Sequence, residues 1–305
     1  MVTEDGKSAT LKDTVFDGGK TMANTQVTKT KANDGNNLPF ASFITNKGIQ
    51  DGIESTIGKE NMTRFVSSII SAVQTTPALK ECTNTSILSG AILGESLKLA
   101  PSPQLGQYYL VPYKDNKSGT TQAQFQMGWR GFIQLAVRSG QYQTIVANEV
   151  KEGELKSYNA ITEEFEIDPM TEDKRQKAKT VGYYAMFKLN NGFRKELYWS
   201  KERMESHAKQ YSAGYRSDCQ KGTKYTFWSK DFDAMAKKTM LRQLIGKWGI
   251  MSIDMQKAYE GDQAVIREDG TPDYIDNRET PEDVIDTVAT EVSENQNTIP
   301  FNPEE

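Results

Sequence analysis

The chain has 305 residues, of which 36% are apolar, below the roughly 45–50% typical of globular domains. With two cysteines (Cys82 and Cys219) and one histidine (His207), a disulfide framework, a cysteine or histidine zinc site and a histidine-based triad are not expected. The net charge of −4 conceals a split, because residues 1–250 carry 34 basic and 26 acidic residues whereas residues 251–305 carry 3 and 15. A basic body followed by an acidic tail indicates a domain that binds a polyanion.

The N-terminal residues 1–37 are rich in Thr, Lys, Asn, Asp and Gly and are predicted to be disordered. Gly18–Thr21 ("GGKT") resembles the end of a phosphate-binding loop, but that motif requires glycine at the position of Thr14. Neither a signal-peptide core nor an apolar run of about 18 residues is found, so a cytoplasmic protein without a membrane span is expected.

The core is predicted to span residues 38–253 and to alternate helices with strands. Pro77 and Pro101 end the first two helices, Gly140 closes the third, and Ser200 caps the fourth. The elements expected in chain order are helix 62–76, helix 84–101, a hairpin of strands 106–114 and 121–128, helix 129–140, strand 142–153, a hairpin over 179–200 turning at Asn190–Gly192, helix 200–211, a polar loop 212–225 and helix 227–249.

This order predicts an α+β fold, in which an antiparallel β-sheet with hairpins packs against several α-helices. Disordered N- and C-terminal tails, residues 1–37 and 254–305, are expected to flank it. Truncation after Asp254 is therefore expected to leave the fold intact.

The last predicted helix carries an unusual pair of charges. Lys238 and Arg242 are four residues apart, share one helix face, and repel each other by roughly 0.2–0.5 kcal/mol. Either that face is simply solvated, or an anion normally sits against it.

Other basic and aromatic residues favour the second reading, because lysine and arginine neutralise phosphates while aromatic rings offer surfaces for bases. Tyrosines are also common in protein cores, so that alternative stays open for the rings. The predicted DNA-binding residues are Lys114, Lys117, Gln126, Arg130, Arg138, Lys224, Lys237, Lys238 and Arg242, with Tyr108 and Tyr109 as base-stacking candidates.

A cluster of carboxylates at residues 161–169 ("ITEEFEIDP") is compatible with a metal-dependent nuclease. Its acidic members are Glu163, Glu164, Glu166 and Asp168. Because Glu164, Glu166 and Asp168 alternate with Phe165 and Ile167, an amphipathic strand with one solvent-exposed face explains the pattern better. No catalytic residue and no metal site are predicted.

Five segments in order resemble the RecT family of phage and prophage single-strand annealing proteins, over about residues 65–253. The chain departs from the family where it has "KEGELKSY" after Val150 instead of the usual "GD.F". The five segments are "TTPALKECTNTSILSGAILGESLKLAP", "YLVPY", "MGWRGFIQLAVRSGQ", "VGYYAMF" and "WSKDFDAMAKKTMLRQL".

The resemblance implies binding of single-stranded DNA and annealing of complementary strands without ATP or another cofactor during homologous recombination. It also implies a homo-oligomer, as a ring or filament, and partners that include the annealed duplex, a phage exonuclease and a host single-strand-binding protein. The alternatives are a non-catalytic DNA-binding scaffold, an ATP-dependent recombinase, which needs a phosphate loop, and the nuclease considered above.

The acidic tail ends in "NTIPFNPEE". An acidic run before Ile299, Pro300 and Phe301 resembles the C-terminal tip of bacterial single-strand-binding proteins, although four residues follow Phe301. A mobile anionic tail that competes with DNA or contacts a host protein is the simpler expectation.

Overall fold

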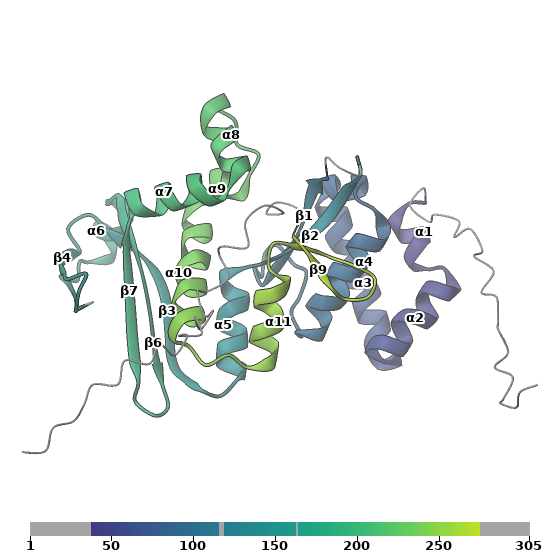
Figure 1. Cartoon of the computed structure of the whole chain (residues 1–305), viewed down its shortest axis with the longest axis horizontal. Coiled ribbons are helices and arrows are strands. Elements are labelled where there is room, and N and C mark those ends of the chain that lie inside the picture. The colour runs from purple at the N-terminus through teal and green to yellow at the C-terminus, as the bar shows by residue number, and fades with distance from the viewer. Residues whose placement is uncertain (1–37, 116–118, 163, 275–305) are drawn as a thin grey trace, which may run out of the picture. The chain divides into compact units, whose positions relative to one another are not determined.

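The computed structural model describes residues 38–115, 119–162 and 164–274 (Figure 1). The predicted N-terminal tail with its "GGKT" stretch, Lys117, Glu163 and residues 275–305 lie outside these described residues.

The described chain begins with a group of helices. Asn46 caps the second of them, since its side chain accepts a hydrogen bond from the Gly48 amide, and Pro77 follows the third, as expected. The helix predicted over 84–101 is shorter than expected, because Lys98 adopts a positive φ of 52° just after the helix ends. These elements are α1 (Phe40–Ile44), α2 (Lys47–Ile57), α3 (Lys59–Thr75), the 3₁₀ turn η2 (Pro77–Glu81) and α4 (Asn84–Ser96).

A first antiparallel sheet has the order β1-β2-β8-β9. The predicted hairpin is confirmed, with Tyr108 opposite Met127 and Lys114 opposite Thr121. Two short strands from the region assigned to the acidic tail extend this sheet, and Phe125 of β2 pairs with Ala264 of β8. The strands are β1 (Tyr108–Lys114), β2 (Thr121–Met127), β8 (Ala264–Ile266) and β9 (Pro272–Asp273).

A second antiparallel sheet is the meander β3-β6-β7. The predicted hairpin of β6 and β7 turns at Gly192, whose φ of 91° is a conformation that glycine adopts without strain. A two-stranded ribbon and a short helix interrupt the chain between β3 and β6. The elements are β3 (Tyr142–Lys151), β4 (Leu155–Tyr158), β5 (Phe165–Ile167), α6 (Glu172–Lys177), β6 (Thr180–Leu189) and β7 (Arg194–Ser200).

The remaining helices largely follow the predicted pattern, and Ser200 caps α7 by accepting a hydrogen bond from the Arg203 amide. The prediction of a polar loop over 212–225 is wrong, since Ala213–Lys221 forms the helix α8. The expected helix 227–249 is interrupted at Asp231, which caps the longer part through the Ala234 amide. The helices are α5 (Trp129–Arg138), α7 (Lys201–Tyr211), α8 (Ala213–Lys221), α9 (Phe227–Lys230), α10 (Phe232–Trp248) and α11 (Ile253–Gly261).

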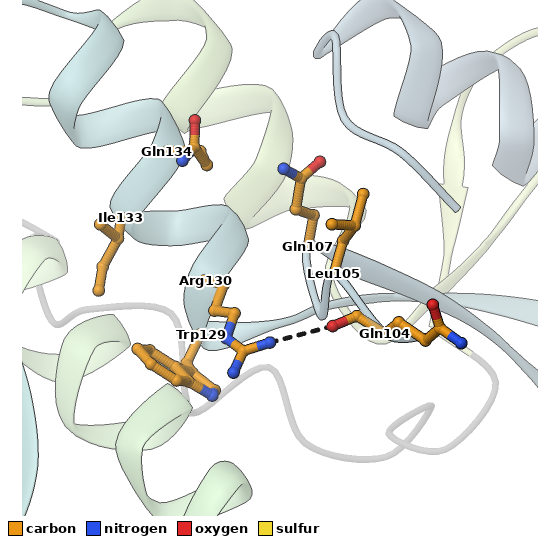
Figure 2. A pocket seen from close by; sticks show the side chains of 7 residues that line it. All are labelled: Gln104, Leu105, Gln107, Trp129, Arg130, Ile133 and Gln134. Atoms are coloured by element: carbon orange, nitrogen blue, oxygen red, sulfur yellow. Dashed lines mark hydrogen bonds between the residues drawn. The ribbon is translucent and has the colours of Figure 1, made fainter. Parts of the chain in front are cut away.

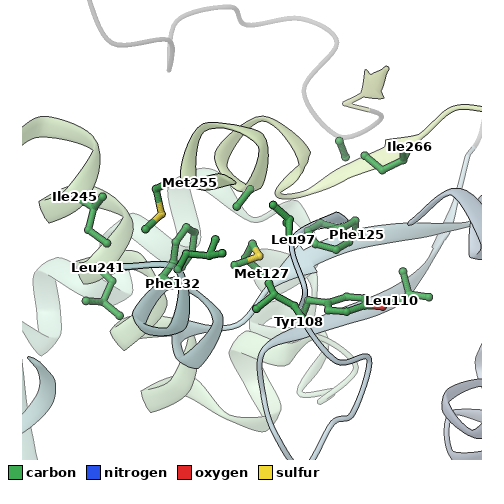
Figure 3. Packing of buried hydrophobic residues seen from close by; sticks show 14 of the residues in the cluster. Leu97, Tyr108, Leu110, Phe125, Met127, Phe132, Leu241, Ile245, Met255 and Ile266 are labelled. Atoms are coloured by element: carbon green, nitrogen blue, oxygen red, sulfur yellow. The ribbon is translucent and has the colours of Figure 1, made fainter. Parts of the chain in front are cut away.

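The hydrophobic core draws side chains from both sheets and from α4, α5, α10 and α11. In the view of Figure 3, Met127 lies between Phe125, also of β2, and Phe132 of α5, and Met255 of α11 lies near Phe132. Because α11 and β8 supply core side chains, ordered structure continues beyond the boundary predicted at residue 253, and truncation after Asp254 would remove part of the core. The predicted α+β class is confirmed.

Candidate nucleic-acid interface

The two like charges of α10 are neutralised inside the protein. Lys238 is only 3% exposed, and its Nζ lies 2.7 Å from Oδ1 of the buried Asp262. Burial lowers the pKa of Lys238, and the charge of Asp262 opposes part of that shift. The sequence argument for an anion against this face is therefore satisfied by a carboxylate of the same chain. The burial removes the basis for assigning Lys238 to a DNA groove.

Arg242 occupies the outer side of the same carboxylate. Its Nη1 lies 2.9 Å from Oδ2 of Asp262, and its guanidinium lies 4.8 Å from the centre of the Tyr259 ring. The side chain is still 36% exposed, so part of its charge faces solvent.

The two neighbouring tyrosines of β1 have different environments. Tyr108 is 1% exposed and stacks on Phe125 with ring centres 5.0 Å apart, so it is a core residue rather than a surface for bases. Tyr109 is half-buried, and its ring lies 5.3 Å from that of Phe227 at the start of α9. Burial is the largest cause that raises the pKa of Tyr109.

Arg138 lies at the end of α5, where its guanidinium donates hydrogen bonds to the Leu97 and Lys98 carbonyls just beyond α4. These contacts satisfy the carbonyls that a helix leaves unpaired at its C-terminus, which gives Arg138 a structural role. Gln126 is half-buried and donates to the Gln124 side chain, whereas Lys114 and Lys224 are exposed.

The first turn of α5 brings cations and rings together. The Trp129 ring lies 5.2 Å from the guanidinium of Arg130 and 4.8 Å from the ammonium of Lys237, which comes from α10. Tyr109 lies close to Arg130, because a β-carbon added at Gly106 would approach both side chains, and the ring of Phe227 lies beside that of Tyr109. We call Tyr109, Trp129, Arg130, Phe227 and Lys237 the Trp129 cluster.

A pocket of about 320 Å³ opens beside the Trp129 cluster. Figure 2 shows Arg130 reaching from α5 toward the loop before β1, where its Nη1 donates to the Gln104 carbonyl over 3.1 Å. The pocket is lined by Gln104, Leu105, Gln107, Trp129, Arg130, Ile133 and Gln134. Amide and guanidinium groups beside an indole ring suit a ligand with hydrogen-bonding edges and a flat face.

An ion-pair network extends from the Trp129 cluster to β3. Lys237 Nζ lies 2.7 Å from Oε1 of Glu149, and Arg175 donates to the Glu149 carbonyl over 2.7 Å. Burial by itself raises the pKa of Glu149, but the hydrogen bond from Lys237 and the charges of Lys237, Lys151 and Arg175 outweigh it and hold that pKa below its usual value. Glu154 pairs with Arg175 over 2.7 Å, so Lys237, Lys151 and Arg175 share the carboxylates of Glu149 and Glu154.

The segment before α9 is fixed by one buried carboxylate. Asp218 of α8 accepts hydrogen bonds from the amides of Tyr225 and Thr226 and from the hydroxyls of Thr223 and Ser229. These hydrogen bonds hold the pKa of Asp218 well below its ordinary value. The anchored turn carries exposed Lys224 and Tyr225 next to Phe227 of the Trp129 cluster.

Trp129 and Phe227 are not among the residues that the sequence predicts to bind DNA. The sequence does place an aromatic residue immediately before Arg130 at the start of a helix, which could have marked Trp129 as a binding residue. The second cation beside this ring, Lys237, is far away in sequence, so the sequence does not show that the two are neighbours. The sequence does predict Tyr109, Arg130 and Lys237, which the fold brings together.

The segment "ITEEFEIDP" follows the amphipathic pattern only at Phe165, because Ile167, expected on the covered face, is 54% exposed. Phe165 stacks on Tyr184 with ring centres 4.5 Å apart, while Glu164, Glu166 and Asp168 are exposed. Among the residues that the structure describes, no group of three His, Cys, Asp or Glu side chains is placed to hold a metal ion. In the same residues, no helix combines the length and apolarity needed to cross a bilayer.

The sequence has relatives among known proteins. It is 39% identical over 266 residues to the uncharacterized protein YqaK of Bacillus subtilis (strain 168), and this alignment covers 85% of this chain and 84% of YqaK. It is 29% identical over 233 residues to protein RecT of Escherichia coli (strain K12), and this alignment covers 74% of this chain and 81% of RecT. The sequence model of the RecT family matches residues 63–280, so the match includes Asp262 and the strands that follow α11. The chain therefore belongs to the RecT family, whose members act in DNA recombination and annealing.

Proposed function

We propose that the protein binds single-stranded DNA across the Trp129 cluster and anneals complementary strands without ATP. The observation that carries this proposal is the approach of two cations, Arg130 and Lys237, to the Trp129 ring, with the Tyr109–Phe227 ring pair close to Arg130. Single-strand-binding surfaces combine these two elements, since cations follow the backbone and rings stack on bases.

Each part of the cluster has a distinct role. Arg130 is exposed and neutralises a phosphate, whereas Lys237 is oriented by Glu149 and becomes available when a phosphate replaces that carboxylate. Lys224, exposed in the turn before Phe227, adds further charge, and the pocket at Gln104 and Gln107 admits the edge of a base.

Annealing needs no chemical step. Stacking in the DNA duplex is worth about 1.4 kcal/mol per base-pair step, so duplex formation is itself favourable. The protein lowers the barrier by reducing the repulsion between two phosphate backbones and by retaining the strands near each other. An oligomeric ring or filament, which family membership supports, would align the cluster of one copy with that of the next.

The binding site is tested by Arg130→Ala, with Arg203→Ala as a matched control. Arg203 is also exposed, and its guanidinium lies 4.4 Å from the ring of another tryptophan, Trp199, on β7. Arg130→Ala is expected to weaken binding of a labelled oligonucleotide and to reduce the salt slope by about 0.7 for each phosphate that is no longer neutralised. If the two variants changed oligonucleotide affinity and salt slope equally, the DNA would not bind specifically at the Trp129 cluster.

The reaction is tested by fluorescence-monitored annealing of complementary oligonucleotides in chelator with no nucleotide added. The protein is expected to accelerate annealing under these conditions, and light scattering is expected to show a homo-oligomer. A requirement for ATP would contradict the proposal. Tight binding without any acceleration would instead identify a DNA-binding scaffold.

A further inference from the structure

A second cluster of tryptophan and lysine lies at the C-terminal end of α10. The Trp248 ring lies 4.5 Å from the ammonium of Lys195, from β7, and 5.8 Å from that of Lys247. Three large apolar side chains nearby are exposed: Phe193 at 45%, Ile250 at 38% and Ile253 at 71%. We call these six residues the Trp248 patch.

The members of the Trp248 patch are connected through the packing beneath them. The Tyr142 hydroxyl donates to the Ile250 carbonyl over 2.9 Å, and the Tyr142 ring lies 5.4 Å from that of Phe187. Phe187 in turn lies 5.9 Å from Phe193, so the β6–β7 turn and the α10–α11 connection form one neighbourhood. Isolated exposed apolar residues are ordinary, but a group with a charged rim marks an interaction surface.

We propose that the acidic segment 275–305 of the same chain docks on the Trp248 patch. Its residues include nine Asp or Glu and one basic residue, Arg278. Apolar side chains are interspersed among these acids, at Val284, Ile285, Val288, Val292, Ile299 and Phe301. A segment that alternates acids with apolar residues matches a surface that combines lysines with exposed Phe and Ile.

The segment can reach the patch within one chain. The Tyr274 hydroxyl donates to the Glu260 carbonyl near the end of α11, whereas Ile253 begins that helix. At about 1.5 Å per helical residue the two ends are roughly 10 Å apart, and an extended chain covers about 3.3 Å per residue. Residues from about Arg278 onward can therefore reach Ile253, and the residues that follow them can extend over Trp248.

Two other occupants fit less well. A symmetric contact with the same patch of a second copy would gather Lys195 and Lys247 of both copies in one interface, which contains no acidic patch residue to neutralise them. Nucleic acid would match the lysines and Trp248 but would gain little from the aliphatic side chains of Ile250 and Ile253.

The proposal is tested in the full chain with the photocrosslinker p-benzoylphenylalanine placed at position 253. The control places it at Ile161, which is 93% exposed in the connection between β4 and β5. After irradiation, mass spectrometry is expected to find peptides from residues 275–305 attached at position 253 and few of them at position 161. Similar yields at both positions, or no tail peptide at position 253, would overturn the docking.

Mixing ¹⁵N-labelled and unlabelled chains separates attachment within a chain from attachment between copies. Docking within one chain predicts crosslinked peptides of uniform isotope content, so mixed products would overturn it. Lys247→Glu is expected to lower the yield about two- to fivefold at low salt, in line with the strength of exposed charge pairs. An unchanged yield would contradict the charge complementarity on which the proposal rests.

Discussion

Lys238 and Asp262 form a buried ion pair in which Nζ lies 2.7 Å from Oδ1 and the side chains are 4% and 0% exposed. The same carboxylate accepts hydrogen bonds from the Met127 amide and from Arg242, both over 2.9 Å. Asp262 thereby ties α10 to the last residue of β2 and to the segment that follows α11. Lys238 and Arg242, whose charges suggested a DNA groove, instead bind the carboxylate of Asp262 and so stabilise the packing of the C-terminal part of the described chain against the core.

Asp262→Ala is expected to destabilise the protein strongly, because it leaves Lys238 buried without its partner. Removing one member of a buried ion pair lowers the free energy of unfolding by about 3–5 kcal/mol. Urea unfolding monitored by circular dichroism measures the effect. Asp254→Ala is the control, since Asp254 is exposed in the first turn of α11, the helix that Asp262 follows, and its loss should cost less than about 1 kcal/mol.

Two truncations are expected to differ sharply. Ending the chain after Tyr274 keeps every described element, so the melting temperature should stay near that of the full chain. Ending it after Asp254 removes Met255, Ala258 and Asp262, and should give a protein that unfolds at lower temperature or aggregates. Equal melting temperatures in calorimetry would show that α11 and β8 contribute little to the core.

Alanine substitutions at Tyr108 and Tyr109 are expected to impair different properties, protein stability and DNA binding respectively. Tyr108→Ala should lower the free energy of unfolding by about 3–5 kcal/mol, because it opens a cavity next to Phe125. Tyr109→Ala should weaken single-stranded DNA binding by about 1–3 kcal/mol, the value of one base stacked on a ring, with a smaller loss of stability. Paired measurements of unfolding and of oligonucleotide binding distinguish the two, and a DNA defect confined to Tyr108→Ala in a folded protein would reverse the assignment.

Glu149 is expected to make stability depend on pH in the acidic range. Its pKa in the folded protein lies below the ordinary value of 4.5, so the unfolded chain binds the proton more tightly. The stabilisation is therefore present above about pH 4.5 and is lost as the pH falls through the lowered pKa. The urea midpoints of the wild type and of Glu149→Gln should converge on acidification, whereas a constant difference between pH 3 and 7 would exclude this linkage.

Elements whose causes are local could be predicted from the amino-acid sequence alone. Apolar periodicity and Pro77 located α3, the turn at Gly192 located the β6–β7 hairpin, and Ser200 marked the start of α7. Each of these signals lies within a few residues of the element that it specifies, so no tertiary contact is needed to interpret it. Arg130, Lys237 and Tyr109 likewise stand out for properties of their own, namely charge or a flat ring.

Which charges are available to a ligand depends on contacts between distant parts of the chain. Lys238 meets Asp262 across 24 positions of the chain, and Lys237 meets Glu149 across 88. Low hydrophobicity also suggested a disordered tail from residue 254, although Met255, Ala258 and Ala264 are buried there. A few apolar side chains and one carboxylate suffice for an ordered segment when the rest of the core already offers them partners, and this complementarity arises only once the chain has folded.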